Sequence, residues 1–196
     1  MRDDVEAIPD LPARAARSAI IASAMGVFGR LGFAATRVED LLAAAGIARR
    51  TFYKYFASKE DVLASIYELT TYELLRAVDR GSDAGADPLA FVRSAMDGYL
   101  DFHAQNGTLL RILVEQAIRS DSALAPLRKR FRARLVEVLA RAATAHGRRS
   151  FDPLLGVALI SALEGVSLEI LEKGATPADV ARAKRTMHGL LAHVFG

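Results

Sequence analysis

The segment from Thr36 to Lys59 constrains the fold more than any other part of this sequence. It begins with Thr36 followed three residues later by Glu39, a spacing that predicts a capping box, in which the two side chains satisfy backbone N–H groups at the start of a helix. Apolar residues then recur at helical spacing as far as Gly46. Glycine ends helices because it adopts the left-handed conformation at little cost, so the first helix of the segment is predicted to stop there.

A second short helix is predicted from about Ala48. Phe52 and Phe56 lie one turn apart and are expected on its inner face, against the rest of the domain. Its other face carries mainly basic and hydroxyl-bearing residues, namely Arg49, Arg50, Thr51, Tyr53, Lys54 and Tyr55. Two short helices joined by a turn with glycine form a helix-turn-helix, whose second helix enters the major groove of DNA.

The residue types on the outer face suit contact with DNA. Arginine can donate two hydrogen bonds to a guanine edge, and threonine can contact the methyl group of thymine. Tyrosine and lysine can bind phosphates, which position a protein without reading sequence. The alternative is a short helix whose basic face is simply solvated. We favour DNA binding because the turn, the apolar anchors and the basic face occur together in one segment.

The run from Gly46 to Glu60, with Phe28, Gly32, Phe33 and Thr36 upstream, resembles the N-terminal domain of TetR-family transcriptional regulators. The matching motif covers about residues 17–63. Such regulators are all-helical homodimers, and their divergent C-terminal domain contains the dimer interface and a small-molecule pocket. The resemblance therefore implies an all-α fold with an N-terminal three-helix DNA-binding domain and a C-terminal helical domain.

Carried over by position, the resemblance also implies which residues contact DNA. The base-reading face corresponds to Arg49, Arg50, Thr51, Tyr53 and Lys54, and the phosphate contacts correspond to Thr36, Tyr55 and Lys59. Two positions depart from the family pattern. Arg37 stands where a second threonine is common, and we expect it to add a phosphate contact. Arg50 stands where a small residue or glycine is common, so the operator sequence cannot be inferred.

The composition is that of a folded protein with one basic region. Of the 196 residues, 52% are hydrophobic and 25% are charged, which is typical of a globular chain. The absence of cysteine excludes disulfides and thiolate metal sites, and it agrees with a reducing cytoplasm. The net charge is only +3, yet residues 11–60 contain eight Lys or Arg and three Asp or Glu, a local net charge of +5. Neutralisation of DNA phosphates requires such a region.

The remaining sequence predicts further helices separated by short Gly or Pro breaks, about nine in the whole chain. One break falls at Asn106 and Gly107. We expect residues 1–10 to form a disordered or extended tail, 11–57 to form the DNA-binding domain, and 58–196 to form a ligand-binding and dimerisation domain. The most apolar run, 154–163, is shorter than the roughly 20 residues of a membrane span, so we expect a buried helix and a cytoplasmic protein.

A small-molecule pocket is expected where polar and aromatic residues occur among the apolar helices of the second domain. Most aromatic residues at helical spacing belong to the core, since a pocket needs only a few polar groups among apolar walls. Glu115 and Glu164 stand in apolar runs, so each requires a cationic ligand or an arginine partner. The candidate pocket residues are Tyr67, Phe91, Met96, Tyr99, Phe102, His103, Leu113, Gln116, Phe131 and Glu164.

The last two helices are candidates for the dimer interface. The first of them is apolar on nearly every side, which requires cover from more than one direction. Either both helices pack inside one monomer, or they pair with their copies across a two-fold axis, as the resemblance implies and as a reader of two half-sites requires. The candidate interface residues are Leu154, Leu155, Leu159, Ala162, Val166, Met187, Leu190, Leu191 and Val194.

We find no catalytic set, cofactor motif or metal site in the sequence. The four histidines do not form a zinc-binding spacing, and there is no cysteine nucleophile. The sequence therefore predicts a transcriptional regulator, with repression favoured over activation. It is expected to bind a palindromic operator in double-stranded DNA as a homodimer and to be released by a small-molecule effector of unknown identity. The alternative is an all-helical enzyme or lipid-binding protein that retains a helix-turn-helix-like N-terminal domain.

Overall fold

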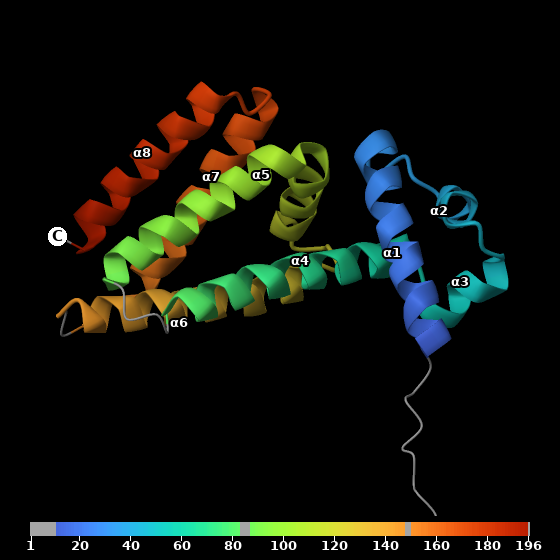
Figure 1. Ribbon diagram of the computed structural model, residues 1–196, viewed down its shortest axis with the longest axis horizontal. Helices are drawn as coiled ribbons and strands as arrows, with labels where there is room; N and C mark the ends of the chain where they lie inside the picture. The colour runs from blue at the N-terminus through green and yellow to red at the C-terminus, as the bar shows by residue number, and fades with distance from the viewer. Residues whose placement is uncertain (1–10, 83–86, 148–149, 196) are drawn as a thin grey trace, which may run out of the picture. The chain divides into compact units, whose positions relative to one another are not determined.

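All regular structure in the described part of the chain is helical (Figure 1). The computed structural model describes residues 11–82, 87–147 and 150–195. Its helices are α1 (Leu11–Leu31), α2 (Val38–Ala45), α3 (Arg49–Tyr55), α4 (Lys59–Ser82), α5 (Pro88–Ile118), α6 (Ala125–Ala145), α7 (Pro153–Glu172) and α8 (Pro177–Phe195). The all-α prediction is confirmed. The predicted tail, residues 1–10, lies outside the described residues.

The described residues form eight helices rather than about nine, because one predicted break leaves a helix continuous. Helix α5 contains both the fifth and the sixth helix that the sequence predicts. They meet at Gly107, where the backbone has φ 29° and ψ −103° and the helix is kinked (Figure 1). A side chain at this positive φ would be strained, which explains why glycine occupies the kink.

The chain separates into two compact units, Met1–Ile66 and Tyr67–Gly196. The beginning of α4 therefore belongs to the first unit, whereas the sequence placed the boundary at residue 57. Two long-range contacts account for this. Arg17 Nη2 donates a hydrogen bond to Ser65 Oγ at 2.7 Å, and Lys59 Nζ reaches the turn that follows α1. These contacts attach residues 59–66 to the first unit.

The core of the first unit contains phenylalanines from α1 and from α3 and its C-cap. Phe28, Phe52 and Phe56 are almost completely buried, and the rings of Phe52 and Phe56 lie 5.8 Å apart between centroids. The prediction that Phe52 and Phe56 anchor the second helix of the helix-turn-helix from its inner side is confirmed. The other buried apolar residues of this unit are Ile20, Ile21, Ala24, Val27, Leu41, Val62, Leu63 and Ile66.

Helices α5, α6, α7 and α8 pack together around the core of the second unit. On one side of this core, α8 is tied to α5 by an ion pair and a hydrogen bond: Lys184 Nζ lies 2.7 Å from an Asp101 carboxylate oxygen, and His188 Nε2 lies 2.9 Å from Asp97 Oδ1. The buried core cluster consists of Val92, Met96, Leu100, Leu139, Ala142, Ala143, Leu159, Ile160, Ile170, Ala183, Met187, Leu191 and Phe195.

Helix α7 is the one described helix that is long and apolar enough to cross a membrane by length and composition. A core helix of a soluble protein passes the same test, and α7 packs against α5, α6 and α8. The sequence predicted that this helix would be covered on more than one side. In the single chain one end of it is uncovered, because Leu154, Leu155 and Val157 are 71%, 39% and 38% exposed.

Candidate DNA-binding surface and ligand cavity

Helix α3 presents a cationic face to solvent. Arg49, Arg50, Tyr53 and Lys54 are exposed, and Thr51 is partly exposed. We call these five residues the α3 surface. The anchoring of Phe52 in the core fixes which side of this short helix faces outward, and the Tyr53 ring packs edge-on against Phe52 at 5.3 Å between centroids. The structure thus brings together the residues that the sequence assigned to base reading, while their contact with DNA stays a prediction.

The start of α2 differs from the predicted capping box. The helix begins one residue later than expected, with Arg37 at the N-cap, and Asp40 Oδ2 accepts a hydrogen bond from the Arg37 backbone N–H at 2.7 Å. Thr36 is buried instead, and its hydroxyl donates to the Gly32 carbonyl at 2.7 Å. The predicted pairing of Thr36 with Glu39 is therefore wrong. The predicted end of the helix is confirmed, because Gly46 is left-handed with φ 64°.

Lys59 occupies a structural position inside the first unit. Its Nζ donates hydrogen bonds to the carbonyl oxygens of Phe33 (2.8 Å), Ala34 (3.3 Å) and Thr36 (2.8 Å), and it lies 4.7 Å from the centroid of the Phe33 ring. All three ammonium donors are thus used by the turn between α1 and α2. The phosphate contacts that the resemblance implied for Thr36 and Lys59 stay predictions, since both side chains already have partners within the protein.

Within the described parts of the chain, Arg49 is the one residue of the α3 surface with a recorded ion pair. Its Nη2 donates to Oε1 of Glu39, in the first turn of α2. Both side chains remain more than half exposed, so the pair lies in solvent beside the α3 surface. The sequence assigned Glu39 to helix capping and therefore missed this contact, which depends on how α2 and α3 pack.

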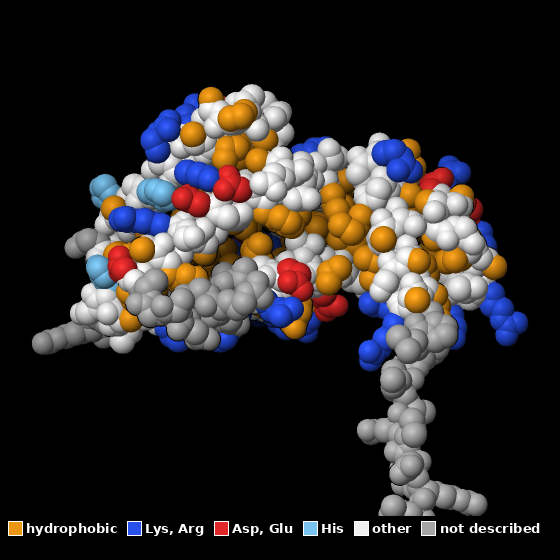
Figure 2. All heavy atoms as spheres, viewed as in Figure 1, with side chains coloured by type: hydrophobic (Ala, Val, Ile, Leu, Met, Phe, Trp, Pro, Cys, Tyr) orange, Lys and Arg blue, Asp and Glu red, His pale blue; other side chains and the backbone are white. Residues whose placement is uncertain are grey.

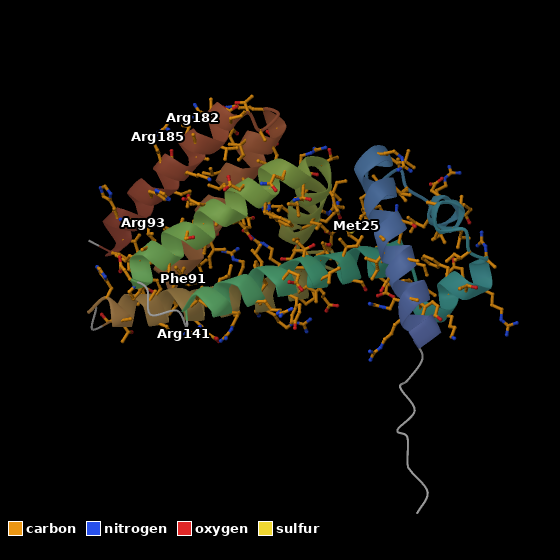
Figure 3. The ribbon with its side chains drawn as sticks, viewed as in Figure 1. Met25, Phe91, Arg93, Arg141, Arg182 and Arg185 are labelled. Carbon is orange, nitrogen blue, oxygen red and sulfur yellow. The ribbon has the colours of Figure 1, made fainter. Side chains whose placement is uncertain are left out.

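The second unit contains a cavity of about 680 Å³ between α4, α5, α6 and α7. Figure 2 shows apolar side chains around the hollow on the side of α4 and α5. Phe91 of α5, labelled in Figure 3, is among its walls, whereas Arg182 and Arg185 extend from the exposed side of α8. The described lining residues are Leu69, Thr70, Glu73, Leu74, Phe91, Val92, Ser94, Ala95, Met96, Gly98, Tyr99, Phe102, Leu135, Val138, Leu139, Leu159, Ile160 and Leu163.

Four of the ten predicted pocket residues line this cavity: Phe91, Met96, Tyr99 and Phe102. The structure places the other six elsewhere in the second unit, and these are Tyr67, His103, Leu113, Gln116, Phe131 and Glu164. Sequence reasoning missed the walls that α4, α6 and α7 contribute. Those walls consist mostly of Leu, Val and Ile, which periodicity alone does not distinguish from core residues.

Glu164 has arginine partners rather than a place in the cavity wall. Arg128 holds its carboxylate with two hydrogen bonds, from Nε at 3.1 Å and from Nη2, and Arg132 Nη1 lies 3.7 Å away. The sequence offered an arginine partner as one of two possibilities, and this one is confirmed. Burial raises the pKa of the nearby Tyr67 and Tyr99 hydroxyls, and the Glu164 charge raises it further. Both phenols are therefore neutral at physiological pH.

His103 is a buried, neutral side chain behind the cavity wall. Its ring lies 3.9 Å from the Tyr99 ring between centroids, and its Nδ1 lies 2.8 Å from the Tyr99 carbonyl oxygen. Burial lowers the pKa of His103 to about 4, although the hydrogen bond to the carbonyl acts in the opposite direction. His103 thus supports Tyr99, which does line the cavity, without contacting the cavity itself.

The predicted dimer residues divide into three groups. Leu159, Met187 and Leu191 are buried in the core of the second unit, and Ala162, Val166 and Val194 are partly buried against it. Leu154, Leu155 and Leu190 are exposed, by 71%, 39% and 41%. The last group offers the most apolar surface to another molecule. The first group is occupied by packing within the chain, which is the alternative that the sequence left open.

Among the described residues, no group of three or more His, Asp and Glu side chains could hold a metal ion. The two glutamates of the cavity region, Glu164 and Glu73, each have an arginine partner. Glu164 is paired with Arg128. Glu73 lines the cavity but is largely exposed, and its Oε1 lies 3.7 Å from Arg76 Nη1. The two candidate sites are therefore a cationic surface in the first unit and an apolar cavity in the second.

Comparison with known proteins agrees with this arrangement. The family model described as bacterial regulatory proteins, tetR family, matches residues 20–66. The regulator EthR of Mycolicibacterium smegmatis is 38% identical over 85 residues, which cover 41% of this chain and 37% of the relative. The repressor SCO4008 of Streptomyces coelicolor is 27% identical over 112 residues, covering 57% of this chain and 55% of the relative. The matches thus span only about a third to a half of these relatives.

Solved structures share the fold over nearly the whole chain. A TetR-like transcriptional regulator from Rhodococcus sp. RHA1 has a TM-score of 0.74 at 24% identity, with 93% of this chain and 97% of that chain covered. FadR from Bacillus subtilis, solved in complex with stearoyl-CoA, has a TM-score of 0.77 at 17% identity, with 89% and 96% covered. Taken with the helix-turn-helix of the first unit, these findings indicate a TetR-family transcriptional regulator, with the family match itself confined to residues 20–66.

Proposed function

We propose that this protein is a ligand-responsive transcriptional regulator that binds an operator through the α3 surface and is released when a small molecule occupies the cavity of the second unit. The observation that carries the proposal is the α3 surface itself. Three cations and two hydroxyl-bearing residues stand on one side of a helix whose other side is fixed by Phe52. This segment also lies within the family match, 20–66.

The α3 surface supports reading of base edges in the major groove. Arg49 and Arg50 each offer a planar guanidinium suited to guanine, and Thr51 offers a methyl group suited to thymine. Tyr53 and Lys54 can reach phosphates beside the groove, and so can Arg37, which is exposed at the start of α2. We expect the arginines to determine sequence preference and the other contacts to contribute affinity that does not depend on sequence.

A homodimer on an inverted repeat is supported by the uncovered apolar side chains of α7 and α8. Leu154, Leu155, Val157 and Leu190 are large apolar residues with more than a third of their surface exposed. Pairing of these helices with their copies would remove this surface from water, which is favourable in proportion to its area. Two chains would then offer two α3 surfaces to half-sites about one turn of DNA apart.

The cavity supports a mainly apolar effector. Its volume lies within the range of about 300–1,000 Å³ that is typical of small-molecule sites. Thirteen of its eighteen described lining residues are Ala, Val, Leu, Ile, Met or Phe, and the Tyr99 ring adds a further wall. The similar fold of Bacillus subtilis FadR was solved with stearoyl-CoA, so a long acyl thioester is a reasonable first probe. Release requires that the effector bind the DNA-free state more tightly than the DNA-bound state.

The test begins with selection of bound sequences from a random duplex pool, followed by gel shifts at several salt concentrations. We expect an enriched inverted repeat, a steep fall in affinity with salt, and release from DNA on addition of stearoyl-CoA or another acyl thioester. Lys54→Ala should weaken binding, whereas Lys129→Ala, which removes an exposed charge from α6, should not. Weak binding to all sequences alike would contradict the proposal and favour an enzyme or lipid carrier with a retained helix-turn-helix.

A further inference from the structure

The ion pair between Arg49 and Glu39 concerns a side chain that the proposed function assigns to base reading. Arg49 belongs to α3 and Glu39 to the first turn of α2, so the pair joins the two helices of the helix-turn-helix. Arg50 and Lys54, the other cations of the α3 surface, have no recorded ion pair in the described part of the chain, although Lys54 lies 5.3 Å from the Tyr55 ring centroid. Glu39 therefore acts on one cation selectively.

Among the described residues, the pair with Arg49 is the only recorded side-chain contact of Glu39, whose place in the first turn of α2 also suits the helix dipole. Capping of α2 is performed by Asp40, whose carboxylate accepts the Arg37 backbone N–H. Glu39 is exposed, so it contributes nothing to the core of the first unit. A carboxylate on a DNA-facing surface repels phosphates, and it therefore lowers affinity for DNA in general. Its position beside Arg49 points to an effect on what that arginine can bind.

We propose that Glu39 is a positioning residue for sequence recognition. Its carboxylate holds the Arg49 guanidinium, prevents it from pairing with phosphate, and so reserves the remaining guanidinium donors for a base edge. The inference rests on the proposed function, since it presumes that the α3 surface reads DNA.

The chemistry of the guanidinium allows both contacts at once. Arginine has five N–H donors in a planar fork, and Glu39 is bound through Nη2 alone. Nη2 carries two N–H groups and Glu39 accepts one of them, so the second, paired with an N–H of Nη1 or Nε on the same edge, stays available as a fork for the two acceptors of guanine. Without Glu39, a flexible and more than half exposed arginine would meet the phosphates first, because these are the nearest strong anions on any duplex. Loss of Glu39 should thus increase general affinity and decrease discrimination.

The experiment compares Glu39→Ala with Glu39→Gln in the full-length protein. The DNA probes are the enriched duplex from the selection, its variants with single base-pair changes, and a duplex of mixed sequence. Glu60→Ala is the matched control, because Glu60 is an exposed carboxylate of the same unit that has no contact with Arg49. Arg49→Ala and the double variant Glu39→Ala/Arg49→Ala complete a cycle, and circular dichroism verifies that each variant is folded.

Glu39→Ala is expected to bind the mixed duplex at least about threefold more tightly, with a salt slope steeper by about 0.9, the value for one further phosphate. Preference at the base pair read by Arg49 should fall at least about fivefold, the lower end for a bidentate contact. Glu39→Gln keeps an acceptor without the charge and should fall between wild type and Glu39→Ala. Glu60→Ala should leave base preference unchanged.

Two results would overturn the inference while the proposed function stands. The first is a Glu39→Ala protein with the base preference and the salt slope of wild type. The second is a loss of preference that is equally large in the Arg49→Ala background, since Glu39 would then contact a base itself. A wild-type protein that enriches no sequence would instead refute the proposed function, and the inference would fall with it.

Discussion

Substitution of Lys59 by methionine tests whether this residue holds the first unit together or holds DNA. Methionine keeps most of the aliphatic stem and removes the ammonium group. The Phe33 and Thr36 carbonyls, which Lys59 reaches at 2.8 Å, are partly buried and would lose their donor, whereas water can replace it at the exposed Ala34 carbonyl. At about 1 kcal/mol for each of the two carbonyls and about 0.5–1 kcal/mol for the contact with the Phe33 ring, the loss should be about 2.5–3 kcal/mol.

The assay is urea unfolding followed by far-ultraviolet circular dichroism, with amide hydrogen exchange at residues 49–56 to assign the transition to the first unit. Lys54→Met is the matched control. Lys54 is exposed on α3 and its recorded contact is with the Tyr55 ring alone, so its removal should change the unfolding free energy by less than about 0.5 kcal/mol while weakening DNA binding. A Lys59→Met protein as stable as wild type that loses affinity for all DNA alike would refute the structural role and restore Lys59 as a phosphate contact.

Three further predictions concern the second unit. The pKa of His103 in the folded protein, about 4, is below its ordinary value of 6.5, so the unfolded chain takes up the proton first as the pH falls. The contribution of His103 to stability is therefore fully present above pH 6.5, and the unfolding free energy should fall by up to about 3 kcal/mol as the pH decreases toward 4. In urea titrations at several pH values, His103→Gln should remove this dependence. Ala95→Phe places a ring in the cavity and should abolish the rise in melting temperature caused by a bound acyl thioester while operator binding persists; an unchanged rise would mean that the probe binds elsewhere. Leu154→Glu introduces a charge at the most exposed apolar position of α7 and should shift sedimentation equilibrium toward the monomer, whereas a dimer of undiminished stability would exclude this end of α7 from the interface.

The parts of the first unit that follow from local rules could be predicted from the sequence. Gly46 ends α2 because its left-handed backbone is a property of glycine, and Phe52 and Phe56 are buried because their spacing puts both on one face. Rules of this kind use only residues within a turn or two of one another. The same kind of rule explains the caps at Asp87 and Asp152, whose carboxylates accept hydrogen bonds from the backbone N–H groups of Leu89 and Leu154.

Contacts between distant residues could not be predicted in the same way. The carbonyls that Lys59 reaches lie 23 to 26 residues earlier in the chain, so no local pattern connects them. The same holds for the pairing of Glu39 with Arg49, which depends on the packing of α2 against α3. Because two acids adjoin at the start of α2, the choice between Glu39 and Asp40 as the capping residue also required the backbone.

The cavity was only partly predictable because its walls and the core consist of the same residue types. Met96 is both a cavity wall and a member of the core cluster, and Leu139 and Leu159 share this dual position. Apolar periodicity indicates that such residues face inward. It does not indicate whether the space in front of them is filled, since that depends on the separation of helices that are far apart in the sequence.

The kink at Gly107 divides α5 into halves with different freedom to change. Every described α5 residue of the cavity wall, from Phe91 to Phe102, precedes Gly107, while the half after it contributes Leu110, Leu113 and Ala117 to solid packing. Substitution of Phe91, Ala95 and Phe102, which line the cavity and lie outside the buried core cluster, should therefore change ligand preference while the protein still folds, whereas substitution of the buried Leu110, Leu113 and Ala117 should destabilise it. One helix thus carries ligand-facing positions that can change and packing positions that cannot, which provides a route by which new effectors can be acquired without rebuilding the protein.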